Sequence, residues 1–192
     1  MSEFNTLVKS GFEYDVAVLR PRWWVPRKLA RNSAFVRRHT GLFFREDKSQ
    51  RERIHNLMPT EGLNHTLSVT FAGGSQVATW YVGLFEGNYT PLSTNTMATF
   101  PAAATESTAY DESVRRTWVE STPAAGATTN SASKAEFTMS ATKTIYGAFI
   151  SSSSVKGGTT GVLASAAKFS SAKTVDDGDI LRVTASISLT SS

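Results

Sequence analysis

The 192-residue sequence contains no cysteine, and this absence excludes several kinds of chemistry. Without cysteine, the chain has no disulfide framework, no thiolate zinc site and no cysteine nucleophile. Only three histidines are present, and His39, His55 and His65 do not form the HxH or HExxH patterns of common metal sites. We therefore expect neither a metal ion nor another cofactor.

Long apolar runs are also missing, and none approaches the roughly 18 residues that a membrane helix needs. The first residues, MSEFNTLVKSGFEYDV, carry acidic groups where a signal peptide would carry basic ones, so we expect neither export nor a membrane partner. Charged residues make up only 19% of the chain and apolar residues 40%, whereas Ser, Thr, Ala and Gly are abundant. This composition is more typical of β-structure with short turns than of a helical enzyme.

Positive charge is concentrated in the first third of the chain. Residues 1–60 contain 12 Lys and Arg against 6 Asp and Glu, whereas the remainder contains 8 against 10. Within this segment, Pro21 and Pro26 bracket an Arg-Trp-Trp-Val sequence, and proline cannot donate to a β-ladder. No pattern would bury the aromatic residues of the segment together. We therefore expect residues 1–60 to be an extended arm that is mobile alone or ordered against another subunit; the alternative is that they wrap their own domain.

Aromatic and arginine side chains are the usual anchors of protein interfaces, and the expected arm is rich in both. The predicted partner-binding residues are Arg22, Trp23, Trp24, Arg27, Phe35, Phe43 and Phe44. Nucleic acid is the weaker candidate partner, because acidic residues are interspersed and no uninterrupted basic run exists. A protein surface is therefore the partner that we favour.

Residues 61–192 show the pattern of a β-domain. Leu67, Val69 and Phe71 alternate with polar residues, and a glycine turn separates them from the aromatic run 77–85, which predicts a hairpin. Residues 110–120 predict another strand, with Tyr110 or Trp118 in the core.

Three further patterns lie in the last third of the chain. Residues 137–140 and 144–150 predict a second hairpin, and the sequence Asp176-Asp177-Gly178-Asp179 predicts a tight turn. Residues 181–189 alternate strictly between apolar and polar side chains, as in a strand with one solvated face. Seven or eight such strands predict an all-β antiparallel sandwich, immunoglobulin-like or jelly-roll, over residues 61–192.

Motifs that would carry catalysis are few. The acidic residues Glu106, Asp111, Glu112 and Glu120 could supply a glycosidase pair, although any acidic surface loop would look the same. The sequence KGGTTG at 156–161 places its lysine before the glycines, opposite to the order in a phosphate-binding loop, so we interpret it as a hairpin turn. We therefore expect a protein that is not an enzyme.

From roughly Leu57 to Ser188, a series of short motifs occurs in a specific order: NLMPTEGLNHTL, TWYVGLFEG, YDESVRRTW, IYGAFI, KGGTTGVL and GDILRVT. In this order they resemble a family of small tailed-bacteriophage virion proteins. The resemblance implies a structural, non-enzymatic component of the virion that is assembled in the host cytoplasm. It carries over no functional residues.

These observations lead to one main hypothesis and two alternatives. The main hypothesis is a capsid decoration or cement protein that binds the phage head, most directly the major capsid protein, through its arm and forms homo-oligomers. The first alternative is a neck or tail component, such as a connector ring, tail-tube or fibre-attachment protein. The second is a receptor- or carbohydrate-binding module that uses loop aromatics such as Tyr89 or Phe100.

Overall fold

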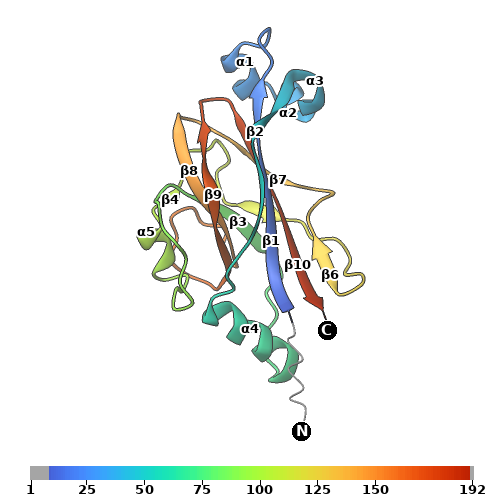
Figure 1. The fold of residues 1–192 in the computed structure, drawn as a ribbon, viewed down its shortest axis with the longest axis vertical. Helices are drawn as coiled ribbons and strands as arrows, with labels where there is room; N and C mark the ends of the chain where they lie inside the picture. Colours follow the sequence, from blue (N-terminus) through green and yellow to red (C-terminus); the bar gives the residue numbers. More distant parts are fainter. Residues whose placement is uncertain (1–8, 191–192) are drawn as a thin grey trace.

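Two antiparallel β-sheets face each other in the computed structural model, which describes residues 9–190 (Figure 1). The first sheet has the order β2-β1-β10-β6, and β7 also pairs with β10. Its strands are β1 (Lys9–Pro21), β2 (Phe44–His55), β6 (Ala127–Thr129), β7 (Ala135–Thr138) and β10 (Ile180–Thr190). The prediction of an all-β antiparallel sandwich is confirmed.

The second sheet has the order β4-β3-β8-β9, with β5 paired to β3. Its strands are β3 (Trp80–Phe85), β4 (Glu106–Ser107), β5 (Arg116–Trp118), β8 (Lys143–Ser151) and β9 (Leu163–Val175). Within residues 9–190, five helices connect or flank the strands: α1 (Arg27–Asn32), α2 (Ala34–Arg38), α3 (Thr40–Phe43), α4 (Thr60–Phe71) and α5 (Phe100–Ala103). None of the helices among the described residues is long and apolar enough to cross a membrane.

The segment that was expected to be an extended arm supplies two strands of the first sheet. β1 pairs with β10 from Lys9 opposite Thr190 to Leu19 opposite Ile180, and β2 pairs with the other edge of β1. Tyr14 is completely buried because every second residue of β1 faces the opposite sheet. The prediction of a separate arm is therefore wrong for both strands, while residues 1–8 lie outside the described residues.

The first predicted hairpin is half wrong. Residues 67–71 belong to α4 rather than to a strand, since Leu63, Leu67 and Phe71 recur every four residues and the alternation of period two was coincidental. Glu61 lies in the first turn of α4, where a negative charge favours the helix. The second half is right, because the strand expected in 77–85 is β3.

The other sequence predictions have mixed outcomes. Tyr110 and Trp118 are both buried, as expected, although β5 covers only three residues. Residues 137–140 and 144–150 do not form a hairpin, because β7 pairs with β10 whereas β8 pairs with β3 and β9. The turn at 176–179 is confirmed, with Gly178 at φ +82°, and so is the last strand, β10.

Glycine allows the second sheet to pack aromatic rings closely. Gly83 lies opposite Phe149 and Gly147 opposite Phe85 in the antiparallel pair β3–β8. A Cβ atom at Gly83 would lie only 2.3 Å from the ring of Phe149, so no side chain fits there. Both rings also pack against Phe100 of α5, with ring centroids 5.3 Å and 5.5 Å away. The long loop before α5 is therefore pinned to the sheet by a buried side chain.

Candidate functional site

Three short helices form one end of the molecule, at the opposite end of the long axis from α4 (Figure 1). We call residues 22–45, which contain α1, α2 and α3, the tip. The side chain of Trp23 is 96% exposed and that of Phe35 62% exposed. Leu29, Leu42 and Trp24 are exposed as well. Exposed apolar side chains that gather in one place mark an interaction site more often than single ones do.

A small core of its own holds the tip on the sandwich. Val25, Ala30 and Val36 are buried against residues at the end of the first sheet, including Leu19 and Ile180. The side chain of Ser33 accepts a hydrogen bond from the backbone N–H of Val36 and so caps α2. Helices of four to six residues are not stable alone, so this packing is what shapes the tip.

Phe43 lies at the centre of the aromatic group. Its ring is 5.5 Å from that of Trp24 and 5.8 Å from that of Phe35, both in tilted or edge-on geometry. Phe35 also contacts His39, with the ring centroids 4.4 Å apart. These contacts hold the rings in place while much of their surface remains exposed, which is the arrangement of a ready-made binding surface.

Ion pairs fasten the tip to the turn between β9 and β10. Arg20, at the base of the tip, donates to Asp179 at 2.9 Å and to Asp47 at 2.9 Å. Arg27 at the start of α1 contacts the other oxygen of Asp179 at 3.0 Å. Asp179 is fully buried, and burial raises its pKa while the backbone N–H of Asp176 and the two arginines counteract that rise.

A third arginine adds a second clamp. Arg31 contacts Asp177 at 3.1 Å and Asp111 at 3.0 Å. The aspartate-rich turn, which lacks the ligand spacing of a calcium loop, thus binds three guanidinium groups instead. Among residues 9–190, no group of three or more histidine, aspartate and glutamate side chains is arranged to bind a metal ion.

The other cations of the tip have no such partner. Residues 16–45 contain eight Lys and Arg and no Asp or Glu, a concentration of positive charge that a count over residues 1–60 hides. Five of the eight form no ion pair with any other described residue: Arg22, Lys28, Arg37, Arg38 and Arg45. The tip therefore combines exposed aromatic rings with uncompensated positive charge.

Most, but not all, of the predicted partner-binding residues meet on this surface. Arg22, Trp23, Trp24, Phe35 and Phe43 lie on the tip and are exposed or half-buried. Arg27 is at the surface, but its guanidinium group is committed to the aspartate turn. Phe44 is a correction: it is 3% exposed and packs in the core beneath the tip, because β2 begins there.

Three of the four carboxylates proposed for glycosidase chemistry have structural partners, whereas Glu120 is exposed. Glu106 forms a bidentate pair with the completely buried Arg115, whose remaining donors bind the carbonyl oxygens of Ser153 and Gly158. Asp111 is held by Arg31. The side chain of Glu112 accepts hydrogen bonds from the backbone N–H and hydroxyl of Thr138. These three carboxylates therefore fasten loops.

Two other candidate sites also have structural roles. Lys156, in the glycine-rich hairpin loop, donates to the carbonyl oxygens of Thr108 and Tyr110 and lies 3.9 Å from the centroid of the Tyr110 ring. Partial burial lowers the pKa of Lys156. The loop aromatics proposed for carbohydrate binding do not form an exposed platform, since Phe100 is fully buried and Tyr89 is half-buried against it.

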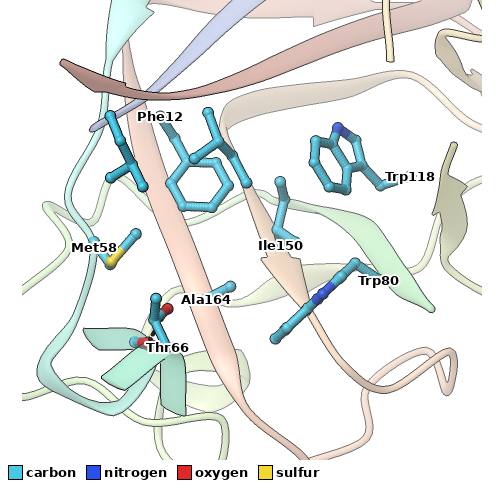
Figure 2. Close-up of a pocket in the computed structure, with 10 residues that line it drawn as sticks. Phe12, Met58, Thr66, Trp80, Trp118, Ile150 and Ala164 are labelled. Carbon is cyan, nitrogen blue, oxygen red and sulfur yellow. Dashed lines mark hydrogen bonds between the residues drawn. The ribbon is translucent and has the colours of Figure 1, made fainter. Parts of the chain in front are cut away.

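An apolar pocket of about 180 Å³ opens beneath α4, at the other end of the molecule (Figure 2). The indole rings of Trp80 and Trp118 and the side chain of Ile150 line one side, and Phe12 and Met58 line the other. Thr66 contributes the hydroxyl at the rim, but this group donates to the carbonyl oxygen of Gly62 within α4. The pocket is therefore lined mainly by apolar side chains, and the hydroxyl of Thr66 is already engaged within α4.

A search of protein-family models and of curated proteins finds no match to this chain.

Proposed function

We propose that this protein is a structural component of a bacteriophage virion, and that it decorates the head by attaching its tip to another virion protein. One observation carries the attachment: the tip holds exposed aromatic side chains and five uncompensated cations on a scaffold that is already ordered. The assignment to a virion depends on the order of motifs along residues 57–188. The major capsid protein is the partner that we favour.

Preorganisation supports a folded protein as the partner. Binding costs free energy when loops and side chains must be ordered, and a surface that is ordered beforehand avoids part of that cost. The ion pairs of Arg20 and Arg27 with Asp179 and the packing of Val36 fix the tip before any partner arrives. Such a surface suits a partner of fixed, complementary shape.

The chemistry of the tip also predicts which groups its binding site on the partner contains. The side chain of Trp23 needs an apolar recess, because tryptophan contributes most when it is fully desolvated at the centre of an interface. Arg22, Lys28 and Arg45 need acidic groups around that recess, since complementary charge speeds association and rejects wrong partners. We therefore expect the tip to bind an apolar recess that is bordered by Asp and Glu.

The experiment uses point variants, because deletion of residues 1–60 would remove β1 and β2 and with them part of the first sheet. Purified protein is incubated with undecorated heads and with isolated tails, each is pelleted, and the bound copies are counted. Trp23→Ala should reduce affinity at least about tenfold, as truncation of an interface anchor does. Its fold should be unchanged because Trp23 is almost fully exposed.

Val155→Ala is the matched control, since Val155 is a 57% exposed apolar residue in the β8–β9 loop, away from the tip. This variant should bind like the original protein. Hundreds of copies on each head would support decoration, whereas a handful of copies or binding to tails alone would indicate the neck or tail alternative. Equal binding by Trp23→Ala and the original protein would contradict attachment through the tip.

A further inference from the structure

Helix α4 carries its large apolar side chains on the face that points away from the sandwich. Leu63 is 42% exposed, Leu67 55% and Phe71 82%; we call these three residues the α4 stripe. A surface helix normally turns such a stripe toward the core. The reversal indicates that something outside this chain's own sandwich covers the stripe.

Small and polar residues take the inward face of α4 instead. A Cβ atom on Gly62 would lie 2.7 Å from the carbonyl oxygen of Ala164 in β9, so the helix sits directly on the strand backbone. His65 packs edge-on against Trp80, with ring centroids 5.5 Å apart. The helix is therefore firmly seated on its small face, and its apolar face is left for another surface.

The segment that carries the stripe has no carboxylate, lysine or arginine side chain after Glu61. Residues 62–85 contain no Asp, Glu, Lys or Arg. The carboxylate of Glu61, just before this run, accepts hydrogen bonds from the backbone N–H groups of Met97 and Leu163. Leu189, which is 58% exposed, lines the same pocket as Thr66 and continues the apolar surface beside α4. An acidic protein or an anionic lipid surface would find no Lys or Arg cation on residues 62–85, whereas an identical uncharged surface would fit.

The spacing of the stripe is also symmetric about its central residue. Leu63 and Phe71 lie four residues before and after Leu67. If a two-fold axis passes beside Leu67, an antiparallel second helix places Leu67 against Leu67 of the second copy and Leu63 against Phe71 of that copy. Two-fold interfaces require this kind of self-complementary pattern. Ridges of residues four apart interlock at about −50° with the axes about 8–10 Å apart.

We propose that the α4 stripe is the interface of a homodimer in which two copies of α4 pack antiparallel about Leu67. This inference goes beyond the proposed function and does not depend on it, because self-association needs no virion. A 12-residue helix is about 18 Å long, so its stripe covers less than the roughly 800 Å² per partner of a standard interface. The dimer is therefore concentration-dependent in solution and strengthened wherever many copies are held close together.

The absence of cysteine allows a direct test of the register. Leu67→Cys should form a disulfide-linked dimer under mild oxidation, because residues on the two-fold axis come within the 4.4–6.8 Å between Cα atoms that a disulfide requires. Leu63→Cys alone should stay monomeric, whereas a mixture of Leu63→Cys and Phe71→Cys should cross-link. Leu92→Cys is the control, since Leu92 is 52% exposed outside α4. Cross-linking of Leu63→Cys or Leu92→Cys as fast as Leu67→Cys would overturn the proposal.

Sedimentation of the full-length protein over a range of concentrations provides the second measurement. The original protein should shift toward the dimer mass as concentration rises, and Leu67→Glu should remain monomeric because it places two carboxylates face to face. Leu92→Glu should behave like the original protein. A dimer that persists in Leu67→Glu would overturn the proposal. So would a full-length monomer that dimerises only after deletion of residues 1–8, because that segment would then be the occupant of the stripe.

Discussion

The two ends of the sandwich both expose large apolar side chains, but they surround them with opposite electrostatics. At the tip, Trp23 and Phe35 stand among five cations without ion-pair partners in the described chain. At the α4 end, Leu67 and Phe71 lie in a run of 24 residues, 62–85, that contains no Asp, Glu, Lys or Arg. Two cationic tips would repel each other, whereas two α4 stripes would not.

This difference assigns a different kind of partner to each end. Charge around an apolar anchor selects for a complementary and therefore different surface, and the lack of charge permits a copy of the same surface. The two ends also differ in how they are held in place. The tip depends on ion pairs with the buried carboxylate of Asp179, whereas α4 depends on the close approach of Gly62 to Ala164. Perturbations of charge should therefore affect one end and spare the other.

The largest effect should follow Asp179→Ala, which removes the carboxylate that anchors the tip. Arg20 and Arg27 would both lose hydrogen bonds to a fully buried carboxylate but would keep Asp47 and Asp176 as partners, so the loss should be about 2–3 kcal/mol. Urea unfolding should show this loss, and binding through the tip should weaken as well. Cross-linking of Leu67→Cys in the same background should persist at temperatures where the sandwich remains folded.

Asp177→Ala is the matched control in the same turn. The side chain of Asp177 is 49% exposed and contacts only Arg31 among the ion pairs, so its loss should cost less than about 1 kcal/mol. If the two variants lost similar stability, the buried anchor would not be what distinguishes the tip.

A smaller effect is expected between the two ends, where β2 meets β9. Glu52 accepts hydrogen bonds from Lys173, which is 1% exposed, and from the backbone N–H of Ser170. Glu52→Gln should cost about 2 kcal/mol, since a buried cation loses its charged partner. Adding Lys173→Met should recover most of that loss, because no charge then remains buried. Urea unfolding of the single and double variants is the measurement.

The same pair predicts how stability depends on pH. Burial opposes ionisation of Glu52, but Lys173 and the backbone N–H of Ser170 outweigh it, so the pKa of Glu52 is lowered. The unfolded chain then binds the proton more readily, and this contribution is present above the ordinary glutamate range and lost as pH falls through the lowered pKa. Glu52→Gln should unfold with a weaker dependence on pH in that range. An unchanged profile would mean that the pair contributes nothing to acid sensitivity.

A rise in salt concentration should weaken binding through the tip by up to about tenfold relative to self-association through the α4 stripe. Raising ionic strength from about 0.05 M to about 0.5 M screens exposed charges, so binding through the tip should weaken several-fold to tenfold. Self-association through the α4 stripe should stay constant or strengthen, because burial of apolar surface is not screened. Pelleting assays and sedimentation at the two salt concentrations measure the two ends independently. If salt weakened both interactions equally, the proposed contrast between a charged tip and an uncharged α4 stripe would be wrong.

Much of the sandwich could be predicted from sequence because its strands alternate cleanly, as in Leu181 to Leu189. The strand β1 was missed as a member of the sheet because its partner in the sheet, β10, is about as far along the chain as possible. Pairing between distant segments leaves no local signal. Helix α4 was misread because Leu67, Val69 and Phe71 also satisfy a period of two, and short apolar patterns do not distinguish strand from helix.

The candidate surfaces were predictable in part for similar reasons. Trp23 and Trp24 were recognisable from the density of aromatic and basic residues. Nothing in the local sequence, however, distinguished the exposed Trp23 from the buried Phe44. The α4 stripe could have been found from the spacing of Leu63, Leu67 and Phe71, had the segment been taken as a helix. Its orientation could not, because that depends on Gly62 fitting against a strand 102 residues away.

The smallest effect should follow Arg31→Ala, which removes the second clamp of the tip. Arg31 is only partly covered, at 35% side-chain exposure, and its partners Asp111 and Asp177 remain solvated when it is removed. Solvent screens such pairs, so they contribute little to stability and the unfolding midpoint should hardly move. Binding through the tip should weaken only slightly, in contrast to Asp179→Ala, and the Leu67→Cys cross-link should be unaffected. If Arg31→Ala instead abolished binding while stability held, Arg31 would contact the partner directly and would belong to the binding surface of the tip.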